Sequence, residues 1–168
     1  QHKKACKKKA AELHDKALFK QPPTEDCPIC FLPMPDSNQI LFKACCGKLI
    51  CDGCDWAGVA KDYERGKKKE EFNLCPFCRT PAAHSEEEEV ARVKKLMEKG
   101  NAKAFSVFAG YYSFGNGGVP QDWNKANELY LKAGELGCAV AYHNLGVIYR
   151  DGRGVEVDKK KAKHYYEI

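Results

Sequence analysis

Eight cysteines between residues 27 and 78 are spaced for metal binding. A C-x-x-C turn can place two thiolates on one ion, and thiolates are preferred ligands of zinc. Three such pairs within 52 residues favour zinc over disulfides or free thiols. The pairs are Cys27 with Cys30, Cys51 with Cys54, and Cys75 with Cys78, and Cys45 and Cys46 lie side by side between the first two pairs.

The run ACCGKLICDGC, residues 44–54, leaves one ligand in question. A metal-binding run of the form C-G-H-x-x-C-x-x-C has histidine where this chain has Lys48, and a protonated amine cannot bind a cation. The candidates for the last ligand are Cys45, His84, Asp52 and water. We favour Cys45, because soft thiolate suits zinc and this cysteine is already adjacent. Lys48 can then offset the negative charge of a four-thiolate site.

The order of the cysteines, with CPIC at 27–30 and CPFCR at 75–79, resembles a RING finger. The resemblance implies a small zinc-stapled α+β domain over residues 25–83, with two structural zinc ions in a cross-brace. One ion would be held by Cys27, Cys30, Cys51 and Cys54. The other would be held by Cys75 and Cys78 together with the ACCGK turn, where Cys46 and Cys45 complete the set of eight.

RING fingers act as ubiquitin ligases that hold a charged ubiquitin-conjugating enzyme and contribute no catalytic residue. The family's contact positions fall on Ile29, Trp56, Pro76 and Arg79, although Trp56 lies closer to the preceding cysteine than the family usually places it. An arginine at this position can bridge the conjugating enzyme and ubiquitin through several hydrogen bonds. The alternative is that Ile29, Trp56 and Phe77 pack a minimal core and that Arg79 is solvated.

The last third of the chain repeats itself with a period of 36 to 37 residues. Ala104 corresponds to Ala141, and Asp122 corresponds to Asp158. Such a period predicts an all-α solenoid of helix pairs. We expect first helices over 102–114 and 139–150. The second helices should begin near Asn124 and Lys159 and be capped by the two aspartates.

The pattern resembles the Sel-one-like repeat, a relative of the tetratricopeptide repeat. The second copy matches it at Ala141, Leu145, Gly146, Tyr149, Gly152, Gly154, Val155, Asp158, Lys161, Ala162 and Tyr166. The resemblance implies repeats over 101–138 and 139–168, the second one truncated. It further implies binding of protein partners along a concave face, with no chemistry.

A connecting segment, residues 84–100, is expected to form a helix over 86–99. Ser85 and Glu88 have the spacing of a capping box, and Val90, Val93 and Met97 form an apolar stripe. Residues 1–24 are predicted to form a basic amphipathic helix or arm.

Charge and hydropathy exclude some functions. The net charge of +5 arises largely from lysine-rich stretches within 3–16 and 65–69, where no aromatic residues interleave for base stacking, so nucleic-acid binding is not expected. No apolar run approaches the 18 or so residues of a membrane helix. We expect a soluble intracellular fragment, cytoplasmic or nuclear, with Cys6 and Cys138 as free thiols.

The sequence thus predicts a RING-like finger followed by a helical solenoid. The leading functional interpretation is a ubiquitin ligase whose finger recruits the conjugating enzyme and whose repeats recruit substrate. The alternative is a non-catalytic zinc-binding adaptor that binds proteins through both parts. No catalytic triad, phosphate-binding loop or pair of catalytic carboxylates is apparent.

Overall fold

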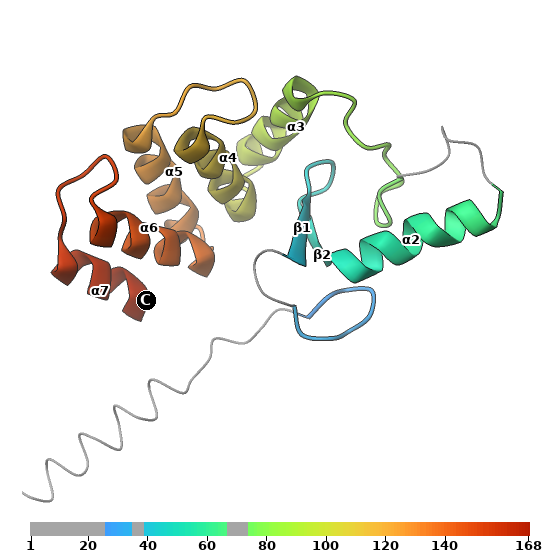
Figure 1. Ribbon diagram of the computed structural model, residues 1–168, viewed down its shortest axis with the longest axis horizontal. Coiled ribbons are helices and arrows are strands. Elements are labelled where there is room, and N and C mark those ends of the chain that lie inside the picture. The colour runs from blue at the N-terminus through green and yellow to red at the C-terminus, as the bar shows by residue number, and fades with distance from the viewer. Residues whose placement is uncertain (1–25, 35–38, 67–73) are drawn as a thin grey trace, which may run out of the picture.

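The computed structural model describes residues 26–34, 39–66 and 74–168 (Figure 1). The helix predicted for residues 1–24 lies outside these ranges. In chain order the elements are β1 (Ile40–Lys43), β2 (Lys48–Cys51), α2 (Asp52–Glu64), α3 (Glu86–Glu98), α4 (Ala102–Phe114), α5 (Trp123–Glu135), α6 (Ala139–Asp151) and α7 (Lys159–Glu167). None of the described helices is long and apolar enough to cross a bilayer.

The cysteine-rich part is built on a short antiparallel hairpin. Ile40 of β1 lies opposite Cys51 of β2, and Lys43 lies opposite Lys48. In the intervening turn the amides of Cys46 and Gly47 donate to the Lys43 carbonyl, at 3.1 and 2.8 Å. The helix α2 follows β2 directly and projects away from the hairpin (Figure 1).

Two C-x-x-C loops flank the hairpin and have the same backbone geometry. In each loop the backbone amide of the first cysteine donates a hydrogen bond to the carbonyl of the residue five positions later. The carbonyl of the same cysteine accepts a hydrogen bond from the amide of the residue four positions later. In the first loop Cys27 donates to Leu32 and accepts from Phe31, and in the second loop Cys75 donates to Thr80 and accepts from Arg79. The distances are 2.8 to 2.9 Å. We call these loops the first and second knuckles.

Packing alone gives the cysteine-rich part a thin core. Its buried apolar residues within the described ranges are Cys27, Ile50 and Cys75, and two of these are candidate metal ligands. No residue of α2, all of which is described, is buried. A unit with so few buried side chains needs another source of stability, which metal can supply.

The connecting helix α3 begins as the sequence predicts. The Ser85 hydroxyl oxygen accepts from the Glu88 amide at 3.2 Å, while the Glu88 carboxylate accepts from the His84 amide at 2.9 Å. The carboxylate therefore caps one residue earlier than in a standard capping box. The buried stripe is Val90, Val93 and Leu96, with Met97 only partly buried, so the predicted stripe is shifted by one residue at its end.

Four helices in two antiparallel pairs confirm the predicted repeats (Figure 1). Asp122 caps α5 by accepting from the amides of Asn124 and Lys125, both at 3.1 Å. Asp158 caps α7 in the same way, at 3.0 Å for both bonds. The capping role predicted for these two aspartates is therefore confirmed.

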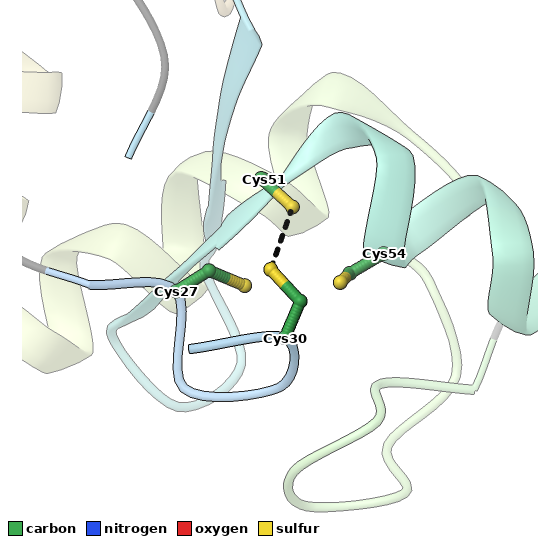
Figure 2. A group of neighbouring side chains, drawn as sticks. All are labelled: Cys27, Cys30, Cys51 and Cys54. Carbon is green, nitrogen blue, oxygen red and sulfur yellow. Dashed lines mark hydrogen bonds between the residues drawn. The ribbon is translucent and has the colours of Figure 1, made fainter. Parts of the chain in front are cut away.

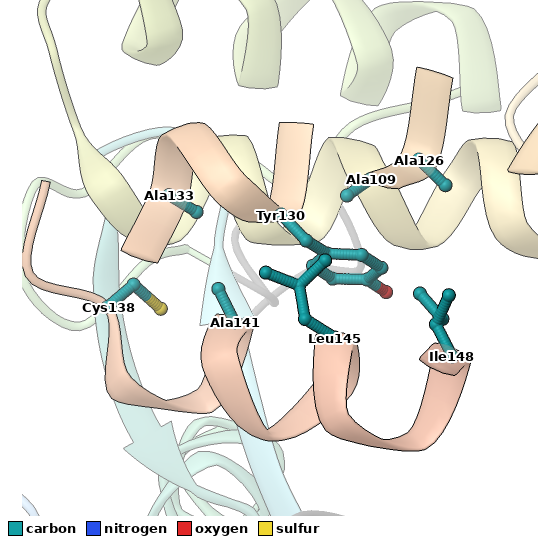
Figure 3. Packing of buried hydrophobic residues seen from close by; sticks show 8 residues of the cluster. All are labelled: Ala109, Ala126, Tyr130, Ala133, Cys138, Ala141, Leu145 and Ile148. Carbon is teal, nitrogen blue, oxygen red and sulfur yellow. The ribbon is translucent and has the colours of Figure 1, made fainter. Parts of the chain in front are cut away.

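Small residues let these helices approach closely. The main cluster of buried residues comprises Ala109, Ala126, Tyr130, Ala133, Cys138, Ala141, Leu145 and Ile148 (Figure 3). A Cβ added to Gly146 would lie 2.5 Å from the Tyr166 ring, so only glycine fits there. Cys138 is buried in this cluster, in agreement with its predicted role as a small apolar residue.

The hairpin rests on the helical half of the molecule. Val90, Val93, Leu96, Ala104 and Phe108 form a second buried cluster, and Phe42 and Ala44 of the hairpin pack against it. In the hairpin turn, a Cβ on Gly47 would lie 2.5 Å from the amide nitrogen of the Asn101 side chain. The cysteine-rich part and the helical half, α3 and α4, therefore share a packing surface.

Replacing Gly154 with alanine is expected to destabilise the repeats by about 2–5 kcal/mol. Gly154 has φ of +69° and an added Cβ would overlap the Cβ of Trp123, so a left-handed penalty of about 1–2 kcal/mol adds to a steric one of about 1–3 kcal/mol. Gly118, the corresponding glycine of the first repeat, has φ of +70° and no neighbour within 4 Å. Gly118→Ala should cost only the first penalty, and equal urea midpoints for the two variants would contradict the overlap.

Candidate metal centre

The first group of cysteines comes from the first knuckle and the junction of β2 with α2. Cys27 and Cys30 belong to the knuckle, Cys51 ends β2, and Cys54 lies in the first turn of α2. Their sulfurs converge on a common centre (Figure 2). All four lie within 4.8 Å of one another, and the sulfurs of Cys30 and Cys51 are 3.9 Å apart. We call this group site one.

The second group joins the hairpin turn to the second knuckle. Cys45 and Cys46 lie in the turn, and Cys75 and Cys78 lie in the knuckle. The Sγ atoms of Cys46 and Cys75 are 3.7 Å apart, and those of Cys78 and Cys45 are 3.4 Å apart. The structure thus brings both adjacent cysteines to one centre, which we call site two.

Both groups fit tetrahedral zinc. Four sulfurs at a zinc–sulfur distance of about 2.3 Å lie about 3.8 Å from one another. The separations of 3.9, 3.7 and 3.4 Å are close to that value. Each centre has four cysteines and leaves no open coordination position, so the geometry suits a structural ion.

Thiolates are available in each site near neutral pH. In site one, burial raises the pKa of Cys27, but backbone amides of Cys51, Cys30 and Ile29 donate to its sulfur, and together they lower the pKa to about 6. In site two, the Thr80 hydroxyl, 3.2 Å away, lowers the pKa of Cys78 to about 6 despite some burial. Thiolate is the form that binds metal, so each site contains a ready ligand.

Other thiols in the two sites have raised pKa values, which a bound cation would lower. Burial, followed by contacts with Cys78 and Cys75, raises the pKa of Cys45 far above its usual value. Burial and the neighbouring cysteines likewise raise the pKa of Cys54 to about 12. Four thiolates at this separation repel one another, and a divalent ion removes that repulsion and drives their deprotonation.

Lys48, in place of the expected histidine, lies over the second knuckle. Its ammonium nitrogen is 4.9 Å from the centroid of the Phe77 ring, between the two cysteines of that knuckle. This cation–π contact holds the start of β2 against site two. Lys43 forms an ion pair with Asp55 of α2, at 2.5 Å.

The other candidates for the last ligand have different partners. His84 is exposed, and its backbone amide donates to Glu88 at the start of α3. Asp52 accepts from the amide of Gly53 at 2.6 Å. Neither residue belongs to a group of potential metal ligands among the described residues. The geometry therefore favours Cys45.

The four predicted contact residues for a conjugating enzyme are not all in one place. Pro76 and Arg79 line a groove of about 360 Å³ between the second knuckle and α2, together with Gly58 and Val59. Ile29 is 41% exposed and Trp56 is 75% exposed, and neither lines this groove. Their exposure contradicts the alternative in which they pack a minimal core.

Two residues of the knuckles have backbone conformations that favour glycine. Phe31 has φ of 57° and Arg79 has φ of 60°. Phe31 is also 76% exposed, and Arg79 is exposed. A large side chain at such a position costs roughly 1–2 kcal/mol relative to glycine, and it gains little from packing here.

The hydroxyl of Thr80, which lies next to site two, was not predicted from the sequence. Thr80 follows the last cysteine by two residues, and its hydroxyl is the main cause of the lowered pKa of Cys78. The corresponding residue of the first knuckle is Leu32, so the pattern of the cysteines carried no signal for it. The ring of Phe77 beneath Lys48 was likewise not anticipated.

Comparison with known families identifies the two repeats. A family profile described as the Sel1 repeat matches residues 108–138 and 139–168. The chain is 36% identical over 73 residues to a protein of Arabidopsis thaliana, the ERAD-associated E3 ubiquitin-protein ligase component HRD3A. That match spans 44% of this chain and only 11% of the plant protein.

Two solved structures are similar to this chain. One is a protective antigen of uropathogenic Escherichia coli with an SLR fold, 30% identical, with a TM-score of 0.48 over 64% of this chain and 23% of that one. The other is a Sel1 repeat protein of Oxalobacter formigenes, 27% identical, with a TM-score of 0.46 over 69% of this chain and 41% of that one. On the evidence of the family profile and of the helices α4 to α7, residues 108–168 comprise two Sel1 repeats that form a helical solenoid.

Proposed function

We propose that this chain is a protein-interaction scaffold in which two zinc ions hold the cysteine-rich part together. Site one would be held by Cys27, Cys30, Cys51 and Cys54, and site two by Cys45, Cys46, Cys75 and Cys78. Zinc would supply folding free energy there and no catalysis, because all four positions at each ion are filled by protein.

The observation that carries the scaffold proposal is the pair of Sel1 repeats. Stacked helix pairs present an extended surface, and such solenoids generally bind other proteins. Among the described residues, the groups of His, Cys, Asp or Glu that could hold a metal ion are the two sets of cysteines. Exposed apolar residues on the first knuckle and on α2, among them Phe31 and Trp56, offer a second surface for partners.

Ubiquitin-ligase activity is the second candidate. It is supported by the two groups of four cysteines, by the groove that contains Pro76 and Arg79, and by the exposure of Ile29. In this case the finger would hold a charged conjugating enzyme and the repeats would bind the substrate. The name of the plant relative, a component of a ubiquitin ligase, is compatible with either a scaffold or a recruiting role.

Discharge of ubiquitin from charged conjugating enzymes separates the two candidates. The scaffold proposal predicts that the zinc-loaded chain does not accelerate transfer to free lysine for any member of a broad panel. Acceleration of tenfold or more that is lost in both Ile29→Ala and Arg79→Ala, and retained in the remote variant Arg150→Ala, would replace the scaffold proposal with the ligase. A gel-based time course of the thioester gives the rates.

A further inference from the structure

A groove of about 140 Å³ lies where the two repeats meet, formed by the end of α4, the start of α5 and α6. Phe114, Trp123, Val147 and Ile148 provide apolar walls. Figure 3 shows the side chain of Tyr130, which also lines the groove, extending from α5 toward Ile148 of α6. A cavity of about 150 Å³ can hold benzene, so this groove has room for one large apolar side chain.

Arg153 is the charged residue among the described residues that line the groove. Its guanidinium carbon lies 5.4 Å from the centroid of the Trp123 ring, a contact that restrains the side chain. The guanidinium also approaches Asp151 at 3.2 Å, but Arg150 already holds that carboxylate at 2.7 and 3.2 Å. Two guanidinium groups thus share one carboxylate, so the Arg153 guanidinium can bind a second carboxylate at this edge of the groove.

An amide at the same junction has no partner. Both polar atoms of the Asn127 side chain are buried, and neither has a hydrogen bond in the described structure. Trp123, Asn127 and Tyr130 follow one stripe of α5, at positions i, i+4 and i+7, and the first and last line the groove. Asn144 of α6 adds another amide to the lining. Asn127 itself does not line the groove, whereas the Asn144 amide does, and a peptide backbone offers that amide a donor and an acceptor.

Tyr130 belongs to the repeat pattern, with Tyr166 as its counterpart, but four other polar or aromatic residues at this junction do not. Their counterparts in the other repeat are unrelated residue types, although both repeats form the same helices. The repeat fold therefore does not require them, and they are free to serve recognition. The pairs are Trp123 and Lys159, Asn127 and Lys163, Asn144 and Val107, and Arg153 and Gly117.

We infer that this groove binds an extended segment of a partner protein in which a large apolar residue adjoins an acidic residue. The apolar side chain occupies the groove, the acidic side chain pairs with Arg153, and the backbone between them faces the Asn144 amide. This inference deepens the scaffold proposal and rests on its assignment of partner binding to the repeats.

Binding of labelled model peptides to the zinc-loaded full chain tests the inference by fluorescence polarisation. The first probe is a glycine- and serine-rich peptide with an internal Phe-Glu pair, and the second has Phe-Gln instead. A third ends at Phe with a free carboxylate and has no acidic residue. We expect the first probe to bind about 10–100-fold more tightly than the second, the range of one charge-assisted hydrogen bond.

Variants locate the binding to the groove. Arg153→Gln should weaken the Phe-Glu probe by the same factor, and Val147→Trp, which fills the groove, should abolish its binding. Lys161→Gln is the matched control, because Lys161 lies over the Tyr149 ring in the same repeat and does not line the groove. It should change affinity less than twofold.

Three results would overturn the inference: equal affinity for the Phe-Glu and Phe-Gln probes, tightest binding of the peptide with the terminal carboxylate, or no saturable binding at millimolar peptide. The comparison of probes on the unmodified chain decides the matter even where a variant fails to fold. The ubiquitin-discharge assay, which tests the proposed function, reports on the cysteine-rich part and not on this groove. A negative result with the peptides can therefore be distinguished from a failure of the proposed function.

Discussion

Removal of zinc with a strong chelator is expected to unfold the hairpin and α2 while the repeats remain helical. Structural zinc sites contribute about 10–16 kcal/mol each to folding in small zinc domains, and the apolar core of the cysteine-rich part is far too small to replace this. By contrast, α4 to α6 are held by a cluster of eight buried residues that includes no candidate metal ligand. After chelation, backbone amides of residues 40–64 should lose their protection from hydrogen exchange, and those of residues 102–151 should keep it, as measured by mass spectrometry.

The contact between the hairpin and the helices α3 and α4 predicts a second, smaller effect of chelation. Phe42 and Ala44 pack against the cluster that includes Leu96 and Phe108, so chelation should also destabilise α3 and the start of α4 modestly, by about 1–2 kcal/mol. The same chelator presaturated with zinc is the control. Full protection of the hairpin after verified removal of metal would contradict a metal-dependent fold.

Replacement of Cys45 with serine is expected to lower the zinc content of the chain from two ions to one. A serine hydroxyl at neutral pH is a poor substitute for thiolate, and site two would retain only Cys46, Cys75 and Cys78. Affinity at site two should fall by more than the roughly 10–100-fold that changes outside the ligand set cause. Competition with a chromogenic chelator measures the loss.

Two variants control this result. Cys138→Ser introduces the same change at a buried cysteine that lies in the helical core, and His84→Ala removes the main alternative ligand. Both should keep two zinc ions. Loss of an ion in His84→Ala, with Cys45→Ser unchanged, would move the last ligand to the histidine.

The repeats could be predicted closely because their signals are local and occur twice. Glycine and aspartate at fixed offsets end and begin helices, so the predicted starts near Asn124 and Lys159 differ from the observed Trp123 and Lys159 by one residue or none. Each C-x-x-C turn is also a local structure, so the spacing predicted the cysteine pairs, whereas the joining of distant pairs into two groups of four was implied by the resemblance to a RING finger.

Contacts between distant segments could not be predicted in the same way. Nothing in the sequence joined Lys48 to Phe77, or Thr80 to the thiol of Cys78, since each contact depends on how the second knuckle lies against the hairpin. The packing of Phe42 on the second helical cluster has the same origin. The groove at the repeat junction also lay outside the repeat pattern, because the residues that distinguish it are the ones that differ between the two copies.

The proposal that two four-cysteine zinc sites organise this scaffold is tested most directly by native mass spectrometry of the intact chain. We expect a mass increase that corresponds to two zinc ions per chain. On acidification the zinc ions should be released and the thiolates should take up protons. A single zinc ion, or a metal-free chain that keeps the folded charge-state distribution, would contradict the account.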